Sequence, residues 1–221
     1  MRTLNGFKCV IFLMLSCSIS LPVFAQRGAD QININGEFVM AAKAGRIERV
    51  AALLTQGAAA NSRDRNGDSP LNMAASKGNE ALVDILMQAG ADVNLANLAG
   101  VTPLMGAAFS GNASIVHKLI SAGAKTDPVD RVKKNAAIYA AGVGCKECLA
   151  ELVRAGAQVN ARLDNDGTLL MWAAGYGHES IVQFLLEQGA DRSLKDNRGK
   201  TAADIARDAN FTAVTKLLEK G

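Results

Sequence analysis

Residues 66–94 read "NGDSPLNMAASKGNEALVDILMQAGADVN", and they begin with the start and stop signals of a short helix. Ser69 provides a side-chain N-cap, and Pro70 occupies the first helical position, where its missing N–H costs nothing. Gly78 can adopt the left-handed conformation that commonly ends a helix. The first half of this stretch therefore predicts one short helix.

A second helix is predicted immediately afterwards, over residues 79–89. Leu82, Ile85 and Leu86 follow the i, i+3, i+4 spacing that places apolar side chains on one face. Gly90 then ends the helix. Because helices of about 10 residues are marginal on their own, each pair must be stabilised by stacking on a neighbouring pair.

The same pattern recurs with a period of 33 residues, in phase and without an insertion. The Ser-Pro-Leu of residues 69–71 returns as Thr-Pro-Leu at 102–104. The glycine that ends the second helix recurs at Gly57, Gly90, Gly123, Gly156 and Gly189. Such periodicity predicts an elongated solenoid in which each unit contacts only its neighbours.

These motifs resemble ankyrin repeats, most clearly at 66–94 and in "LAGVTPLMGAAFSGNASIVHKLISAGA" at 98–124. The resemblance implies an all-α ankyrin-repeat solenoid, in which each unit has two antiparallel helices and a projecting turn, with one concave binding face. The predicted organisation is a signal peptide (1–25), a linker (26–36) and an ankyrin repeat domain (37–221), which comprises an N-terminal repeat (37–62), four full repeats (63–95, 96–128, 129–161, 162–194) and a C-terminal cap (195–221).

The third full repeat departs from the pattern at its start. It reads "KKNAA" at 133–137, where the first two full repeats have glycine, a capping hydroxyl and proline. We therefore expect its first helix to be less firmly capped.

The N-terminus, "MRTLNGFKCVIFLMLSCSISLPVFAQ", has the three parts of a secretory signal peptide. A basic region precedes an apolar core over 9–15, and Val23-Phe24-Ala25 places small residues at −3 and −1 of a cut after Ala25. The apolar run is far below the ~20 residues that span a bilayer, which disfavours an uncleaved anchor. A lipoprotein modified at Cys17 is the other alternative. We expect a periplasmic or secreted protein without membrane contact after cleavage.

The composition is that of a globular protein, with 49% hydrophobic and 20% charged residues. The formal net charge of +3 falls to +1 without residues 1–25, because these contain Arg2 and Lys8 and no acid. A near-neutral chain lacks the electrostatic footprint of nucleic-acid binding. No nucleic-acid partner is therefore expected.

The sequence contains no recognisable catalytic or metal-binding arrangement. We interpret His117 as a surface residue and His178 as a local packing and capping residue. Acidic side chains recur where turns need bonds to nearby backbone, at Asp64, Asp130, Asp164 and Asp196. No EF-hand calcium motif is present. We expect no enzymatic activity, catalytic residue, metal or cofactor.

A binding surface is the stronger expectation. In each first helix, three positions spaced i, i+3, i+4 are free of core packing, and the resemblance places them on the concave face. Exposed tryptophan and tyrosine are typical of interface hot spots. The candidate partner-binding residues are Leu98, Val101, Phe109, Tyr139, Val143, Trp172 and Tyr176. The alternative is that the rings are buried between repeats.

Cys145 and Cys148 form a C-x-x-C pair in the third full repeat, "GVGCKECLAELV" at 142–153. By the register, Cys145 lies at the capping position of a second helix, and Cys148 takes an inward apolar position. In an oxidising compartment the pair can form a local disulfide. Two unlinked cysteines and a redox-active pair are the alternatives. A helix N-terminus lowers thiol pKa, as in redox motifs, but the flanks "GVG" and "LAEL" do not resemble a thioredoxin active site and no βαβ pattern surrounds the pair.

The leading functional hypothesis is a non-enzymatic, exported module that binds a protein partner through the concave face of its middle repeats, as a monomer. The alternatives are a thiol-redox protein that uses Cys145 and Cys148, and an accessory factor that stabilises a periplasmic enzyme.

Overall fold

The computed structural model describes residues 23–220, and describes side chains from residue 33 onward except at position 164. Residues 1–22, most of the predicted signal peptide, lie outside the described residues. Within the described chain every regular element is helical. The α-helices are α1 (Val23–Lys43), α2 (Ile47–Thr55), α3 (Pro70–Ser76), α4 (Glu80–Gln88), α5 (Pro103–Phe109), α6 (Ala113–Ser121), α7 (Ala136–Val143), α8 (Lys146–Arg154), α9 (Leu169–Gly175), α10 (Glu179–Glu187), α11 (Ala202–Asp208) and α12 (Thr212–Glu219), and a 3₁₀ turn spans Asp164–Asp166.

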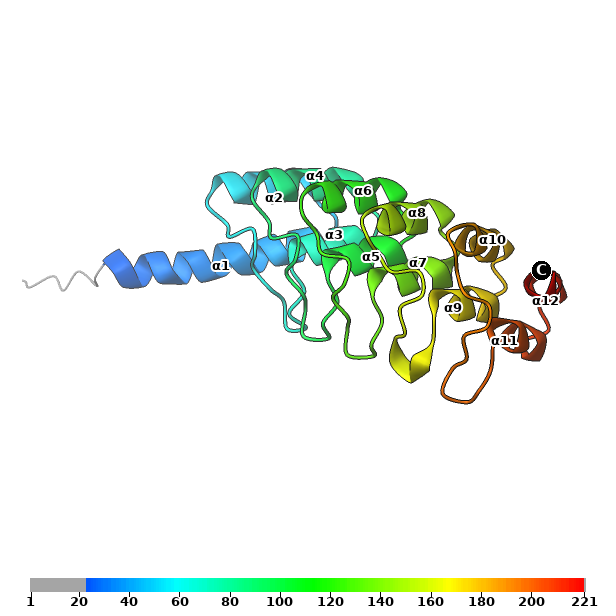
Figure 1. Cartoon of the computed structure of the whole chain (residues 1–221). Coiled ribbons are helices and arrows are strands. Elements are labelled where there is room, and N and C mark those ends of the chain that lie inside the picture. Colours follow the sequence, from blue (N-terminus) through cyan, green and yellow to red (C-terminus); the bar gives the residue numbers. More distant parts are fainter. Residues whose placement is uncertain (1–22, 221) are drawn as a thin grey trace, which may run out of the picture.

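The helices form two layers that run the length of the molecule (Figure 1). The first helices of the units, α3, α5, α7, α9 and α11, form an inner row in which each packs against the next. The second helices, α4, α6, α8, α10 and α12, form an outer row, and long turns project beyond the inner row (Figure 1). This architecture confirms the predicted all-α solenoid.

Side-chain caps begin the inner helices. Ser69, Thr102, Thr168 and Thr201 each accept a hydrogen bond from the backbone N–H three residues on, at the start of α3, α5, α9 and α11 respectively. Asn135 does the same for α7, with its Oδ1 accepting from Ile138 N at 3.0 Å. The expectation of a weaker cap in the third full repeat is therefore wrong, because asparagine is as good an N-cap as serine or threonine.

The projecting turns are held by acceptor side chains, and three of these are the acids predicted for this role, Asp64, Asp130 and Asp196. The fourth predicted acid, Asp164, lies outside the side chains that the structure describes. Asp130 Oδ1 accepts from the N–H groups of Val132 and Lys134 at 2.9 Å each. The same pair of bonds recurs at Asp64, Asn97 and Asp196. In the fourth full repeat the equivalent position is Leu163, which has no polar side chain. Its turn instead contains the 3₁₀ segment.

The core is built from two kinds of residue that the 33-residue register superposes. A leucine on each of the outer helices α4, α6, α8 and α10 is fully buried, at Leu86, Leu119, Leu152 and Leu185. Alanine pairs on the inner helices are buried too, including Ala107 with Ala108 and Ala140 with Ala141. Small side chains let the two rows approach closely, and the leucines fill the space between them.

Helix α1 continues through the segment 26–36, which the sequence analysis treated as a linker. It extends past the first repeat along the direction of the inner row (Figure 1). Its C-terminal part is fixed to the repeats by the Glu37–Arg49 ion pair at 2.5 Å and by Asn35 Oδ1, which accepts from Ala59 N at 2.8 Å. Among the described residues no helix combines the length and apolar character needed to cross a membrane.

Candidate functional site

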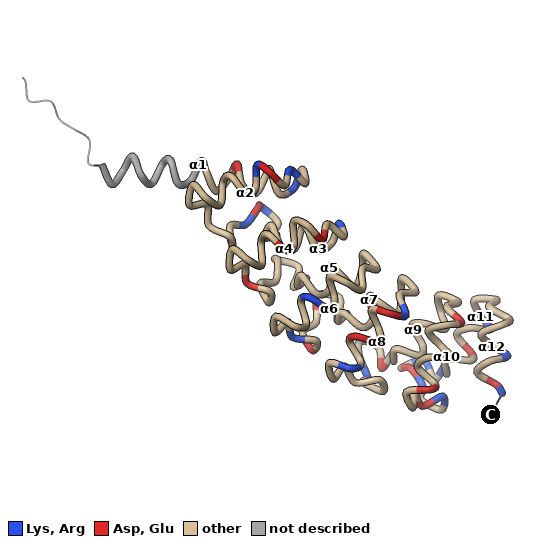
Figure 2. Tube along the Cα trace, turned by 90° about the horizontal axis from the view of Figure 1, so that it is seen from above, with Lys and Arg blue, Asp and Glu red and all other residues tan. Residues whose placement is uncertain are grey.

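The inner helices α5, α7 and α9 present an uncharged face. Their sequences, PLMGAAF, AAIYAAGV and LLMWAAG, contain no ionisable residue apart from Tyr139. Figure 2 shows these segments in tan, whereas Lys, Arg, Asp and Glu are interspersed along the outer row. The middle of the inner row is therefore the region where apolar side chains can meet a partner without burying charge.

The predicted rings on this face are unequally exposed. Phe109 and Tyr176 have 59% and 51% of their surface exposed, and Val143 is also exposed. Tyr139 and Trp172 are half-buried and pack against the core. Tyr139 and Trp172 thus meet the alternative of rings packed between repeats, whereas Phe109 and Tyr176 face solvent.

Five of the predicted residues line one cleft of about 190 Å³, namely Phe109, Tyr139, Val143, Trp172 and Tyr176. The cleft lies across α5, α7 and α9. Gly142 is part of its lining, and a Cβ there would make an ordinary van der Waals contact with the Tyr176 ring at 3.6 Å.

The other two predicted residues lie apart from this cleft, in the projecting turn before α5. Leu98 is exposed, and its amide donates to Asn66 O at 3.0 Å across neighbouring turns. Val101 is half-buried, and its carbonyl accepts from Asn72 Nδ2 at 2.8 Å. The structure gives Val101 a part in joining repeats and leaves Leu98 exposed beside the inner row.

The ring pairs give the cleft two different walls. Phe109 and Tyr139 meet edge to face, with centroids 6.0 Å apart. The rings of Trp172, on α9, and Tyr176, at its C-cap, are nearly parallel, with centroids 6.1 Å apart. Both arrangements are favoured by the quadrupoles of aromatic rings. Each wall therefore pairs an exposed ring with a half-buried one.

Lys134 is a site residue that the sequence analysis missed. Its Nζ lies 4.6 Å from the centroid of the Trp172 ring and 5.9 Å from that of Tyr139. Among the described side chains no carboxylate forms an ion pair with it. A cation over aromatic faces gains stabilisation without an anion. Only the three-dimensional approach of the turn to α9 reveals this placement.

The hydroxyl of Tyr139 is held by the buried carboxylate of Asp130. Its hydroxyl donates to Asp130 Oδ2 at 2.5 Å, while the other oxygen of Asp130 holds the turn. Burial, together with the Asp130 carboxylate, raises the pKa of Tyr139 to about 12. The hydroxyl therefore stays protonated at neutral pH, and it serves to fix the ring rather than to transfer a proton.

A second, larger cleft of about 540 Å³ lies on the other side of the Trp172 and Tyr176 pair. It reaches the C-terminal cap, where Arg198 and Ile205 contribute to its lining. The register could have indicated Ile205, which lies 33 residues after Trp172. The side chains of Trp172 and Tyr176 thus line both clefts and lie between them.

The two histidines have structural contacts. His117 is exposed, with Nδ1 3.1 Å from Glu151 Oε2. His178 precedes α10 without a side-chain capping bond, so its predicted capping role is wrong. Its Nε2 instead lies 2.9 Å from Gly142 O, and its ring packs where a Cβ on Gly144 would clash. Within the described chain no cluster of three His, Cys, Asp or Glu side chains could hold a metal.

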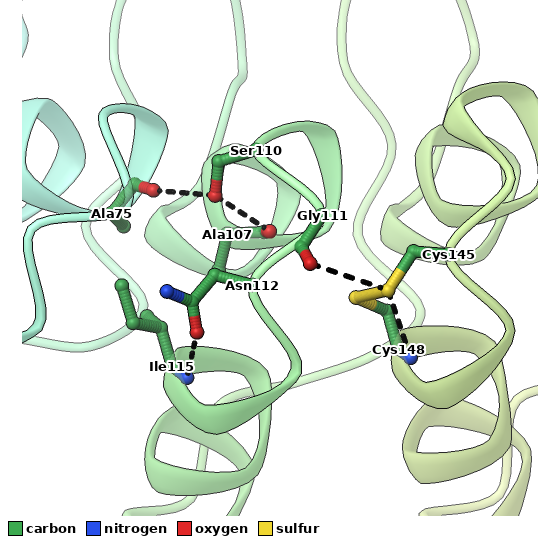
Figure 3. The surroundings of a disulfide bond; sticks show 8 residues. All are labelled: Ala75, Ala107, Ser110, Gly111, Asn112, Ile115, Cys145 and Cys148. Carbon is green, nitrogen blue, oxygen red and sulfur yellow. Dashed lines mark hydrogen bonds between the residues drawn. A yellow bond between two sulfur atoms is a disulfide. The ribbon is translucent and has the colours of Figure 1, made fainter.

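Cys145 and Cys148 lie at the first turn of α8, on the outer row (Figure 3). Their Sγ atoms are 2.09 Å apart, which is bonding distance. Cys145 is the N-cap, with Sγ accepting from Cys148 N at 3.1 Å, and Cys148 is fully buried. Neither cysteine lines either of the two clefts that flank Trp172.

Comparison with known proteins supports the fold independently. A family model described as ankyrin repeats (3 copies) matches residues 38–131, 104–196 and 137–221. No curated protein matches the chain. Ankyrin repeats indicate a protein–protein interaction module, and proteins built from them are generally non-enzymatic. With matches that together cover 38–221, the chain belongs to the ankyrin-repeat family.

Proposed function

We propose that this protein is an exported, non-enzymatic module that binds a protein partner across α5, α7 and α9. The observation that carries the proposal is the cleft in which exposed Phe109 and Tyr176 meet the fixed rings of Tyr139 and Trp172. Exposed aromatic side chains beside rigid ones are typical of interface hot spots, since little conformational entropy is lost on binding.

The cleft favours a partner segment that combines an apolar side chain with a carboxylate. The rings offer apolar surface, and Lys134 holds a cation at 4.6 Å from the Trp172 centroid without an acidic partner among the described side chains. An incoming carboxylate would gain a charge-assisted bond without breaking an existing ion pair. Complementary charge of this kind also sets the orientation of a bound segment.

Export remains a proposal that rests on residues 1–25. The test is the mass of the protein recovered from the extracytoplasmic fraction of its native cell. Cleavage after Ala25 predicts a mature chain that begins at Gln26. A full-length mass would contradict cleavage after Ala25, and recovery from the cytoplasm alone would contradict export.

The binding face is tested with purified components after the partner has been identified by crosslinking. We expect Phe109→Ala and Tyr176→Ala each to weaken binding by at least about tenfold, which corresponds to ~1.4 kcal/mol. Because both rings are exposed, the thermal midpoint should change little. Titration calorimetry and thermal unfolding measure the two effects on the same samples.

Met40→Ala is the matched control, because Met40 is 65% exposed but lies on α1, far from the cleft. It should leave the affinity unchanged. Lys134→Gln should weaken binding and Lys134→Arg should restore much of it, since arginine keeps the charge. Equal affinities for wild type, Phe109→Ala and Tyr176→Ala would refute the proposed face.

A further inference from the structure

The cysteine pair replaces residues that the same fold uses elsewhere without sulfur. One repeat earlier, α6 begins with Asn112, whose Oδ1 accepts from Ile115 N at 3.0 Å. Cys145 and Cys148 occupy the equivalent positions at α8, and the Cys145 sulfur accepts the equivalent bond (Figure 3). The repeat therefore has a working helix start that needs no cysteine.

A bond between these sulfurs adds little to folding. The two residues are separated by 3 positions in the sequence, and the stabilisation expected from a disulfide grows with the length of the loop that it closes. The neighbouring helix α6 begins in the same way with only the hydrogen bond of its capping asparagine. A purely structural staple is therefore a weak explanation for the pair.

The two sulfurs differ in access. Cys145 is part-exposed at the edge of the core, and its Sγ lies 3.5 Å from the carbonyl oxygen of Gly111. Cys148 is fully buried in the core. An external thiolate can reach the Cys145 sulfur and is kept from the Cys148 sulfur.

The reduced form would also be stabilised at this place. A Cys145 thiolate would keep the N–H of Cys148, now 3.1 Å from its sulfur, and would lie at the positive end of the α8 dipole. Helix N-termini lower the pKa of thiols for this reason. A disulfide whose reduced form is stabilised is easier to reduce.

We propose that Cys145–Cys148 is a thiol–disulfide exchange site that accepts electrons from a dithiol reductant. A thiolate of the reductant attacks Cys145 Sγ, the Cys145–Cys148 bond breaks, and its electron pair leaves on Cys148 Sγ, which takes a proton from solvent. The second thiolate of the reductant then attacks its own sulfur in the mixed disulfide and releases the Cys145 thiolate. Two electrons pass to the protein, and the reductant becomes a disulfide.

The site is independent of the proposed partner cleft, since neither cysteine lines it. The repeats remain folded in both states, because a Cys145 thiolate caps α8 as Asn112 caps α6. The activity is therefore a reversible one on an unchanged scaffold.

The test equilibrates the native, oxidised protein with a series of glutathione ratios, followed by acid quenching, alkylation and mass measurement. We expect the pair to titrate from disulfide to dithiol within this series, with an unchanged far-UV circular dichroism spectrum. Structural disulfides of secreted proteins resist the glutathione pool. A pair that stays oxidised at the most reducing ratio, or whose reduction unfolds the protein, would overturn the proposal.

Two variants assign the attacked sulfur and keep the helix start intact. Cys148→Ile introduces the isoleucine that α6 has at this position, Ile115. Cys145→Asn introduces the capping asparagine that α6 has, Asn112. With oxidised glutathione, Cys148→Ile should form a mixed disulfide at Cys145, and Cys145→Asn should react at least tenfold more slowly. Equal rates in the two folded variants would contradict the role of Cys145.

Discussion

The first two full repeats and the last two share one core but differ at their surfaces. In the first two, proline follows the N-cap at Pro70 and Pro103, and glycine takes the left-handed turn position at Gly67 and Gly100. Their outer helices α4 and α6 begin with capping asparagines. This half follows the rules for stable helix starts and turns at each position.

The last two full repeats break these rules in several places. Lys133 and Asp166 adopt positive φ angles of 59° and 58° at the turn position. Cys145 and His178 replace asparagine at the outer-helix starts, and prolines are absent after the N-caps. The aromatic cleft and the cysteine pair lie in or beside this half.

The deviations of the last two full repeats do not extend to the core. Leu152 and Leu185 are as fully buried as Leu86 and Leu119. Local rules are commonly broken at functional positions and compensated elsewhere. Here the compensation is the repeated leucine and alanine core, which lets the C-terminal half carry less regular turns and caps.

The largest effect should come from that shared core. Leu86→Ala and Leu152→Ala each remove a buried side chain at the same position of α4 and α8, and each should lower the free energy of unfolding by about 2–5 kcal/mol. Urea unfolding measures both. The exposed Leu98→Ala is the control, with an expected change under about 0.5 kcal/mol. A much smaller loss for Leu152→Ala would show that the two halves do not share equivalent packing.

A smaller effect is expected where the third full repeat uses its own anchor. Tyr139→Phe removes the donor to Asp130 and leaves one oxygen of a buried carboxylate without its bond. The expected loss is about 1–2 kcal/mol. Tyr176→Phe, on the exposed ring, should cost less than about 0.5 kcal/mol. Similar losses in both would mean that the Asp130 bond contributes nothing specific.

The stability difference between wild type and Tyr139→Phe should also depend on pH. Because the folded state raises the pKa of Tyr139 to about 12, the unfolded chain ionises first as pH rises. The contribution of the protonated hydroxyl is complete below the unfolded pKa of about 10. It is lost progressively between about 10 and 12. The stability difference between wild type and Tyr139→Phe should therefore shrink over this range, and a constant difference would contradict the assignment.

The smallest effect should come from the turn glycine that the third full repeat lacks. Lys133→Gly relieves a left-handed conformation and should raise stability by up to about 1 kcal/mol. Gly100→Ala, at the equivalent position, should lower it, since its Cβ would lie 3.1 Å from Asp130 Cα. Thermal unfolding of the two variants compares the halves directly. A loss of stability in Lys133→Gly would show that the lysine stabilises the turn by contacts of its own.

Features repeated in the sequence were predicted well. The N-caps at Ser69 and Thr102, the turn acceptors at Asp64 and Asp130, and the capping position of Cys145 all follow from local bonding within one unit. Such bonds depend on residues two to four positions apart, and the register repeats them. The all-α solenoid followed from the same periodicity.

Features that depend on contacts between units were not predicted. The position of Lys134 over Trp172, the bond from His178 to Gly142 and the contribution of Arg198 to a cleft each join different repeats. Side-chain rotamers and the spacing of the inner row decide these contacts, and neither is encoded in one unit. The bond from Tyr139 to Asp130 lies within the third full repeat and was missed as well, because it spans nine positions and depends on the Tyr139 side-chain conformation.

One contact recurs along the molecule with a changing partner. The glycine at the end of each inner helix faces the residue that starts the next unit's outer helix. The pairs are Gly45 with Asn79, Gly78 with Asn112, Gly111 with Cys145, Gly144 with His178 and Gly177 with Phe211. One backbone shape therefore accepts side chains from asparagine to phenylalanine.

This tolerance makes the junction between units interchangeable. Removal of residues 63–95, one full period, would keep α5, α7 and α9 and would bring Gly45 against Asn112, which the chain already pairs with Gly78. Gain or loss of whole units by recombination can thus shift the aromatic cleft along the array without rebuilding the seam that joins it. Because these glycines accept different side chains, the number of repeats can change in evolution without changes to the binding surface.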